Sequence, residues 1–247
     1  MPREARTLTV VGAGYRLVGA ESGSAGEERP AVGDEPVLEG VARPAADRRA
    51  TDALRRKRGF DLVVGGTALV LLAPLLGVVA LVIRVVDGGP VLFRQTRIGL
   101  AGRPFQLVKF RTMERGAEDR LEELMPRNEI RGPAFKVTDD PRLTRTGGVL
   151  RSTSLDELPQ LWNVLRDDMS LVGPRPPLPR EVDDYDPWHR RRLAIKPGIT
   201  GLWQVQAREG QDFDQRVELD LEYIERRSMR LDLEILVRTI PAMFKGR

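Results

Sequence analysis

Residues 62–83 read LVVGGTALVLLAPLLGVVALVI, a run without a single charged side chain. A helix rises about 1.5 Å per residue, so this run reaches roughly 33 Å, close to the thickness of the hydrocarbon core of a bilayer. An uncharged run of this length is more typical of a membrane helix than of a buried helix in a soluble protein. The stretch therefore predicts a membrane protein.

Basic residues flank the apolar run on both sides: 55–58 precede it, and Arg84 and Arg94 follow it. A single membrane crossing would leave one basic flank outside, against the preference of Lys and Arg for the cytoplasmic side, whereas a re-entrant hairpin keeps both flanks inside. Pro74, which follows Ala73, removes a backbone donor near the middle of the run and predicts a bend there. Charge and proline favour the hairpin, and the single span remains the alternative.

The composition excludes several kinds of structural and catalytic site. The chain has 247 residues, no cysteine and one histidine, which excludes disulfide scaffolds, thiol nucleophiles and multi-histidine zinc sites. The formal net charge is +4, yet residues 1–52 hold 7 arginines against 9 acidic residues. The rest of the chain is therefore the basic part, and it predicts an anionic partner: phosphate groups, acidic lipid or nucleic acid.

The rest of the sequence predicts an N-terminal tail followed by one domain that contains both helices and strands. Residues 1–52, rich in Gly, Ala, Pro, Glu and Arg, predict a poorly ordered tail. Residues 53–247 form the domain, with its membrane helix over about 57–86. Short β-type runs at 91–93 and 105–110, around a glycine-rich turn, predict a β-hairpin.

Helical patterns follow the hairpin. A polar amphipathic stretch covers 114–126, and a helix is expected over 154–165. Apolar residues recur at helical spacing over 213–224 and over 233–244. Each of these last two stripes either packs into a core or lies on a membrane surface beside nearby arginines, and both alternatives are open.

The adjacent carboxylates of Asp156 and Glu157 stand at the start of the expected helix 154–165. A helix N-terminus favours ionised carboxylates and attracts phosphate, so an aspartate there is suited to hold a divalent cation or attack phosphorus. The alternative is structural, because Ser154 and Glu157 form an S-x-x-E capping box. From these residues alone the capping interpretation is favoured.

Two further segments carry candidate phosphate ligands. In VGPRPP (172–177), Arg175 stands between prolines that restrict the backbone, an arrangement suited to a phosphate clamp and also typical of a plain polyproline linker. The stretch KPGITGLWQVQAREG (196–210) contains a Pro-Gly turn, further glycines and Arg208. It suits the close approach of a ligand, or an ordinary turn before a strand.

Taken in order, these pieces resemble the bacterial sugar transferase family, the monotopic phosphoglycosyl transferases. The matching segments are KRGFDLVVGG, GGPVLFRQTRIG, FQLVKFRTM, DPRLTRTGGVLR, TSLDELPQLWNVLRDDMSLVGPRP and KPGITGLWQV. The resemblance runs from Lys57 to about Phe244. It implies an α+β, mainly helical monotopic fold with a re-entrant N-terminal membrane helix, a small β-hairpin and amphipathic interfacial helices.

The resemblance also implies a reaction. Members move a sugar 1-phosphate from a UDP-sugar to undecaprenyl (polyprenyl) phosphate, releasing UMP, with Mg²⁺ as cofactor, on the cytoplasmic face of the bacterial inner membrane. The family's catalytic pair falls on Asp156, the implied nucleophile and Mg²⁺ ligand, and Glu157. The family's phosphate-binding positions correspond to Arg151, Arg175, Arg208, Lys109 and Arg111. The family's products initiate exopolysaccharide, capsule, O-antigen or glycoprotein glycan synthesis.

Two positions depart from the family pattern. Ala73 stands where many members have serine before the proline, so the helix break loses a hydroxyl that would bind freed backbone groups. Asp167 replaces the commoner glycine and adds an acid at a turn. A non-catalytic, membrane-tethered protein that binds acidic lipid is the alternative function. A nucleic-acid partner is not expected, because acids are interleaved with the arginines and no known motif occurs.

Overall fold

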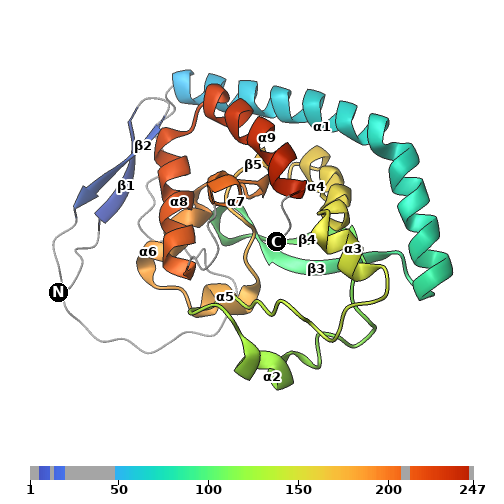
Figure 1. Ribbon diagram of the computed structural model, residues 1–247. Helices are drawn as coiled ribbons and strands as arrows, with labels where there is room; N and C mark the ends of the chain where they lie inside the picture. Colours follow the sequence, from blue (N-terminus) through green and yellow to red (C-terminus); the bar gives the residue numbers. More distant parts are fainter. Residues whose placement is uncertain (1–5, 12–13, 20–47, 207–211, 245–247) are drawn as a thin grey trace.

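The computed structural model describes residues 6–11, 14–19, 48–206 and 212–244. This part of the chain is mainly helical and contains three two-stranded sheets (Figure 1). The strands are β1 (Arg6–Val11), β2 (Gly14–Gly19), β3 (Leu92–Ile98), β4 (Pro104–Phe110), β5 (Ser170–Val172) and β6 (Gly198–Thr200). The α-helices are α1 (Arg48–Val82), α2 (Leu121–Leu124), α3 (Gly147–Ser152), α4 (Leu161–Leu165), α5 (Pro179–Asp183), α6 (Pro187–Arg190), α7 (Leu202–Gln206), α8 (Phe213–Arg226) and α9 (Met229–Phe244). Short π or 3-10 segments are η1 (Ile83–Asp87), η2 (Leu100–Gly102), η3 (Met125–Arg127), η4 (Leu155–Gln160) and η5 (Arg191–Ala194).

The predicted hairpin is confirmed as the antiparallel pair β3–β4, whose register runs from Leu92 opposite Phe110 to Ile98 opposite Pro104. The turn between the strands closes with a hydrogen bond from the Gly99 N–H to the Arg103 carbonyl at 2.8 Å. The hairpin lies near the centre of the molecule, with helices packed around it (Figure 1). It therefore supplies the frame on which later segments are placed.

The long apolar helix is also confirmed. Helix α1 continues into η1, and over Thr51–Asp87 the mean hydropathy of its most apolar window is 2.8, with 11% of that window buried. A core helix of a soluble protein would be mostly buried, so this helix presents apolar side chains that the described residues do not cover. Figure 1 shows α1 changing direction part-way along. Pro74 lies inside it and interrupts its hydrogen bonding. Its topology in a membrane stays a prediction.

Both ends of α1 nevertheless pack against the same body. Near its start, Phe60 and Val64 pack on the main core cluster. Near its end, Val79 and Ile83 are buried against Phe110 of β4 in a separate cluster. The other face of α1 is exposed from Val63 to Val85, and Val70 and Leu71 are among the most exposed large apolar side chains of the described residues.

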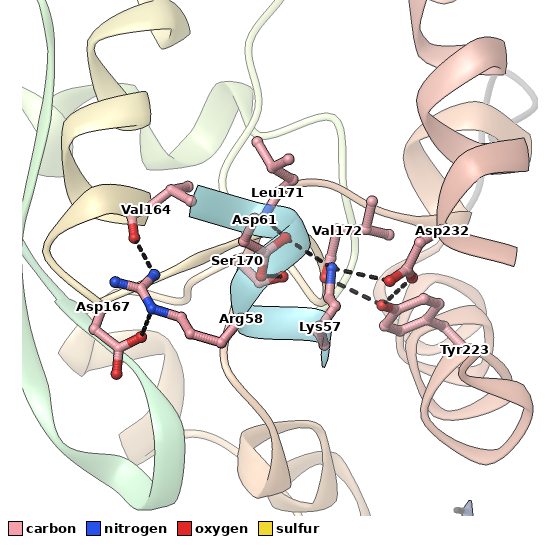
Figure 2. Close-up of polar contacts among 10 residues, drawn as sticks. All are labelled: Lys57, Arg58, Asp61, Val164, Asp167, Ser170, Leu171, Val172, Tyr223 and Asp232. Atoms are coloured by element: carbon pink, nitrogen blue, oxygen red, sulfur yellow. Dashed lines mark hydrogen bonds and ion pairs between the residues drawn. The ribbon is translucent and has the colours of Figure 1, made fainter. Parts of the chain in front are cut away.

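Polar contacts fix the start of α1 (Figure 2). Lys57 Nζ lies 3.0 Å from Asp61 Oδ1 and 2.9 Å from Asp232 Oδ2 of α9. Asp61 also accepts hydrogen bonds from the Ser170 hydroxyl at 2.8 Å and from the Leu171 N–H at 3.3 Å. Because Asp61 and Asp232 are both buried, the Lys57 cluster, defined here as Lys57, Asp61, Asp232, Ser170 and Tyr223, joins α1 to β5 and α9.

Asp167, the predicted departure from glycine, takes φ 74°, the left-handed backbone that glycine favours. Its carboxylate lies 2.8 Å from Arg58 Nε and 2.6 Å from Lys196 Nζ. Arg58 in addition donates to the carbonyls of Val164 and Leu165. The added acid thus binds the basic flank of α1 to the loop after α4.

The two apolar stripes near the C-terminus behave differently. In α8, Phe213, Val217 and Ile224 are buried, so this stripe is core. In α9, Leu233, Val237 and Ile240 are all more than half exposed, so core packing is the wrong interpretation for most of that stripe.

Two helix predictions are wrong in part. Over 114–126 the helix is confined to α2, because Gly116 takes φ 74° and the chain before α2 forms turns. Over 154–165 a 3-10 segment, η4, replaces the first half of the expected helix, and Pro159 inside it lacks an N–H. The predicted tail over 1–52 stays a prediction, since 20–47 lie outside the described residues.

Candidate active site

The candidate site forms where η4 packs against β4. The buried Asn163 side chain of α4 joins the two segments: its amide donates to the Gln106 carbonyl at 2.7 Å, and its carbonyl accepts from the Val108 N–H at 3.0 Å. These bonds replace strand pairing along this edge of β4. They set η4, which carries Asp156, beside β4, which carries Lys109.

Asp156 itself is buried, with 6% of its surface exposed. The residue before η4, Ser154, takes φ 55° and ψ 16°, and its side chain makes no capping hydrogen bond. The expected Ser154–Glu157 capping box is therefore wrong, because the left-handed conformation turns the serine away from the cap geometry. A non-glycine residue in this region is strained, and such strain is frequent at functional sites.

Cations surround this carboxylate. Burial, followed by repulsion from Arg97 and Arg151, lowers the pKa of Lys109 to about 8, while Asp156 acts in the opposite direction. Burial also lowers the pKa of Arg151, again opposed by Asp156. Arg175 contributes to the lowering in both cases. Lys109 and Arg151 therefore lie close to Asp156, and Arg97 and Arg175 lie close to Lys109; these four are called here the site cations.

A hydrogen bond to Thr112 fixes the position of the Arg151 side chain. It extends from α3, and its Nε donates to the Thr112 hydroxyl at 3.2 Å. The Thr112 carbonyl accepts from the Thr144 N–H at 3.0 Å. Gly147, at the start of α3, lies so close to the Thr112 carbonyl that an added Cβ would sit 2.0 Å from it. Only glycine allows α3 this approach, which brings Arg151 to the end of β4.

Arg175 is exposed to solvent, whereas Arg151 is partly buried. Residues 169–177 are buried except for Arg175, which is exposed. The segment thus forms a buried base with one projecting guanidinium, which is unlike a solvated polyproline linker. This arrangement suits a ligand that arrives from solvent and carries negative charge.

The other predicted residues lie at different places. Glu157 is near enough to Arg97 to raise its pKa, against burial and Arg175, which together lower it to about 10. Arg111 is buried and donates to the carbonyls of Asp87 and Gly88 at the end of α1. Arg208 lies outside the described residues. Ala73 and Pro74 are both exposed within α1.

An open pocket of about 350 Å³ adjoins this end of α1. Arg111 lines it, followed in the chain by Thr112, the partner of Arg151. The Asp87 carboxylate accepts from the Thr146 hydroxyl, so the end of α1 is tied to the start of α3. The lining residues are Val86, Asp87, Gly88, Gly89, Arg111, Glu114, Arg115, Thr144 and Arg145. The pocket therefore lies between the apolar helix and the candidate site.

The described residues contain no group of three His, Cys, Asp or Glu side chains placed to hold a metal ion. Mg²⁺ is commonly bound by one or two carboxylates together with substrate phosphates, so Asp156 with Glu157 fits that mode. A metal held by protein side chains alone does not fit the described residues.

Sequence reasoning missed three buried residues that shape the site. Arg97 and Arg192 contact the backbone around Arg175. Asp140 forms a buried pair with Arg142 at 2.7 Å and counteracts the lowering of the Arg151 pKa. Arg97 and Asp140 lie within the quoted motifs. Arg97 could not be told from a surface charge because the carbonyl that it contacts, that of Pro176, is distant in sequence, whereas the pair of Asp140 with Arg142 is local.

Comparison with known proteins identifies the family. A family model described as bacterial sugar transferase matches residues 52–246. This chain belongs to the bacterial sugar transferase family. Within the family, it is 40% identical over 195 residues to the exopolysaccharide production protein ExoY of Sinorhizobium fredii, covering 77% of this chain and 86% of that protein.

Two further relatives carry names that state a substrate or an activity. The chain is 44% identical over 198 residues to the UDP-glucose:undecaprenyl-phosphate glucose-1-phosphate transferase of Caulobacter vibrioides, with 76% of this chain and 69% of that protein covered. It is 47% identical over 161 residues to the galactosyl transferase CpsE of Streptococcus agalactiae. That match covers 65% of this chain and 36% of the relative, so the chain spans about a third of CpsE.

Proposed function

We propose that this protein transfers a sugar 1-phosphate from a UDP-sugar to undecaprenyl phosphate, releasing UMP. The observation that carries the proposal is the buried Asp156 carboxylate within the site cations. Lys109 has three arginines around it against the one carboxylate of Asp156, which leaves positive charge for a diphosphate, and phosphoryl transfer depends mainly on positioning and charge neutralisation. The name of the relative from C. vibrioides states both substrate classes, and that of the relative from S. agalactiae states the transfer of a galactosyl group.

The proposed reaction has two steps with a covalent intermediate. An Asp156 oxygen bonds to the β-phosphorus of the UDP-sugar, and the bond from that phosphorus to the bridging oxygen breaks, so UMP leaves with the electron pair. An oxygen of undecaprenyl phosphate then bonds to the same phosphorus, and the bond to Asp156 breaks. The carboxylate is regenerated and the product is undecaprenyl-diphosphate sugar. Two steps allow a soluble and a membrane-bound substrate to react in turn.

Each side chain has a proposed role in these steps. Lys109 and Arg151, which are partly buried near Asp156, would bind the phosphoryl group that is transferred. Arg175, exposed on its buried base, would bind the diphosphate as it arrives from solvent. Glu157 would orient the acceptor phosphate or share Mg²⁺ with Asp156. When bound, Mg²⁺ would supply neutralisation of the diphosphate charge.

The contacts that both ends of α1 make with the rest of the domain support the re-entrant topology. Its start is bound through the Lys57 cluster and its end through Asp87 and Ile83, while one apolar face stays exposed along the helix. A helix that crossed a membrane once would carry one of these ends to the opposite side, away from the body that both contact. We therefore propose that both ends lie on the cytoplasmic face of the bacterial inner membrane, with the bend near Pro74 inside the lipid.

UMP release tests the reaction. The purified protein, held in nanodiscs with Mg²⁺ and undecaprenyl phosphate, is given a panel of UDP-sugars, with Asp156→Asn as the test variant. Asp183→Asn, an exposed aspartate of α5, is the matched control. We expect UMP release by the wild type and the control, and a loss of at least about 10³-fold in Asp156→Asn, as is usual on removing a nucleophile. Undiminished release by Asp156→Asn would exclude the proposed nucleophile.

Cysteine labelling tests the topology, and the cysteine-free chain makes each introduced thiol unique. Single cysteines replace Asp52 and Arg94, exposed residues on either side of the apolar run. The hairpin predicts that both react with an impermeant maleimide only after the cytoplasmic side is opened. Labelling of one of them in intact spheroplasts would mean a single crossing.

A further inference from the structure

Each backbone carbonyl of residues 174–177, the segment that carries Arg175, accepts a hydrogen bond from another segment. Residues 174–177 read PRPP, so three of the four lack an N–H and the segment is held through its carbonyls. The Pro174 carbonyl accepts from the Gly198 N–H at 2.9 Å, and the Pro177 carbonyl accepts from the Ile98 N–H at 2.9 Å. These outer bonds come from the backbone of β6 and β3.

The two inner carbonyls are held by arginine side chains instead. Arg97 Nη1 donates to the Pro176 carbonyl at 2.9 Å. Arg192 Nη2 donates to the carbonyl of Arg175 itself at 3.4 Å. A guanidinium is a planar fork of donors, so it fixes the direction of a carbonyl that it contacts while bonding elsewhere with its other nitrogens.

Arg192 is itself rigidly placed. It is 5% exposed, it pairs with the buried Asp220 of α8, and it donates to the Tyr185 hydroxyl at 2.9 Å. Burial raises the pKa of Asp220 to about 6 despite the arginine beside it. Although burial alone would lower the pKa of Arg192, Asp220 raises it. At neutral pH both groups are charged, so the pair persists.

Arg97 is placed by its own strand. Its Nε and Nη2 donate to Gln95 Oε1 at 3.1 and 2.7 Å, and 6% of its surface is exposed. The Gln95 amide in turn donates to Glu118 at 2.7 Å. Two buried guanidiniums, from β3 and from η5, thus converge on the backbone of adjacent residues, while the side chain between the prolines projects outward.

We propose that Arg192 and Arg97 are positioning residues for Arg175: they hold its backbone from behind so that its guanidinium meets the diphosphate of the UDP-sugar in one orientation. The inference rests on the proposed function, because it needs a diphosphate ligand at Arg175. Neither arginine contacts substrate in this role.

A double-mutant cycle separates positioning from plain structural support. Arg192→Lys keeps the charge that pairs with Asp220 and removes the fork. We expect it to lower kcat/KM for the UDP-sugar about tenfold, through a higher KM, in the range of one hydrogen bond to a charged group. In the Arg175→Ala background the same substitution should cause no further loss, because the residue it positions is gone. Arg226→Lys, an exposed arginine on α8, is the matched control and should leave kcat/KM unchanged.

Two results would overturn the inference: an equal fold loss in both backgrounds, or no loss in either. A melting temperature for each variant identifies a loss that comes only from unfolding. If Arg192→Lys does not fold, Arg97→Lys is put through the same cycle, because it acts on the next carbonyl from a different element. Absence of UMP release by the wild type would reject the proposed reaction itself, whereas an active wild type with additive losses would reject only the positioning role.

Discussion

Two clusters of buried charge in this protein are built around a lysine, and they differ in the sign of the charge around it. Lys57 lies within 3.0 Å of one oxygen of each of two buried aspartates. Lys109 lies instead among three arginines, with Asp156 as its main opposing charge. One ammonium between two buried carboxylates has no charge left for an anionic ligand and stabilises the fold, whereas a surplus of cations is stabilised when an anion binds. The difference indicates which lysine is structural and which serves the ligand.

Removing Lys57, the lysine paired with carboxylates, should have the largest effect, on stability. Lys57→Met leaves Asp61 and Asp232 buried without their cation, and breaking a buried pair in this way costs about 3–5 kcal/mol. We expect a clear fall in the free energy of unfolding of the detergent-held protein. Lys136→Met, at an exposed lysine, should change it little. An unchanged stability in Lys57→Met would mean that the cluster is solvated and that the comparison fails.

Removing the other lysine should affect activity instead. Lys109→Met takes away one of the site cations, and loss of one such group commonly lowers the rate about 10²-fold. Because the remaining cations repel one another less in the variant, its stability should be kept or raised. Steady-state UMP release together with melting temperatures tests both parts. A variant that loses stability and keeps kcat/KM would reverse the assignment of the two lysines.

The pH profile should sharpen the comparison further. Lys109 has a pKa lowered to about 8, so its charge is present below pH 8 and is lost as the pH rises above it. We expect kcat/KM, which reports the free enzyme, to fall up to tenfold per pH unit above about 8. The phosphate substrates stay ionised there, since phosphate monoesters have their second pKa near about 6. In Lys109→Arg the falling limb should move to higher pH, and a limb that stays in place would assign it to another group.

The smallest effect is expected at Asp167. Its ion pairs with Arg58 and Lys196 involve a side chain that is 52% exposed, and such pairs contribute little. Asp167→Gly removes them but relieves the left-handed backbone while making the unfolded chain more flexible. We expect the free energy of unfolding to change by less than about 1 kcal/mol. A loss as large as that of Lys57→Met would show that the basic flank of α1 depends on Asp167.

Much of the fold follows from local pattern. The apolar run of α1, the β3–β4 hairpin and the α8 stripe were all predicted, because period, turn residues and hydropathy are properties of neighbouring residues. Two of the predictions that were wrong involve one backbone angle each. Ser154 takes a left-handed φ that removes the capping box. Gly116 also takes a left-handed φ, and α2 begins only at Leu121. Such angles depend on the segments packed on either side of the residue.

The sequence by itself determined the family, the apolar helix and the residues with the chemistry for phosphoryl transfer, since these depend on residue type and spacing along the chain. Tertiary structure decided which charges are balanced and which are not. It buried Asp156 among cations from three separate elements, exposed Arg175 alone in a buried segment, and left most of the α9 stripe uncovered. The physical reason is that burial and the local field are set by residues distant in sequence, such as Arg192 behind Arg175, which no local pattern records.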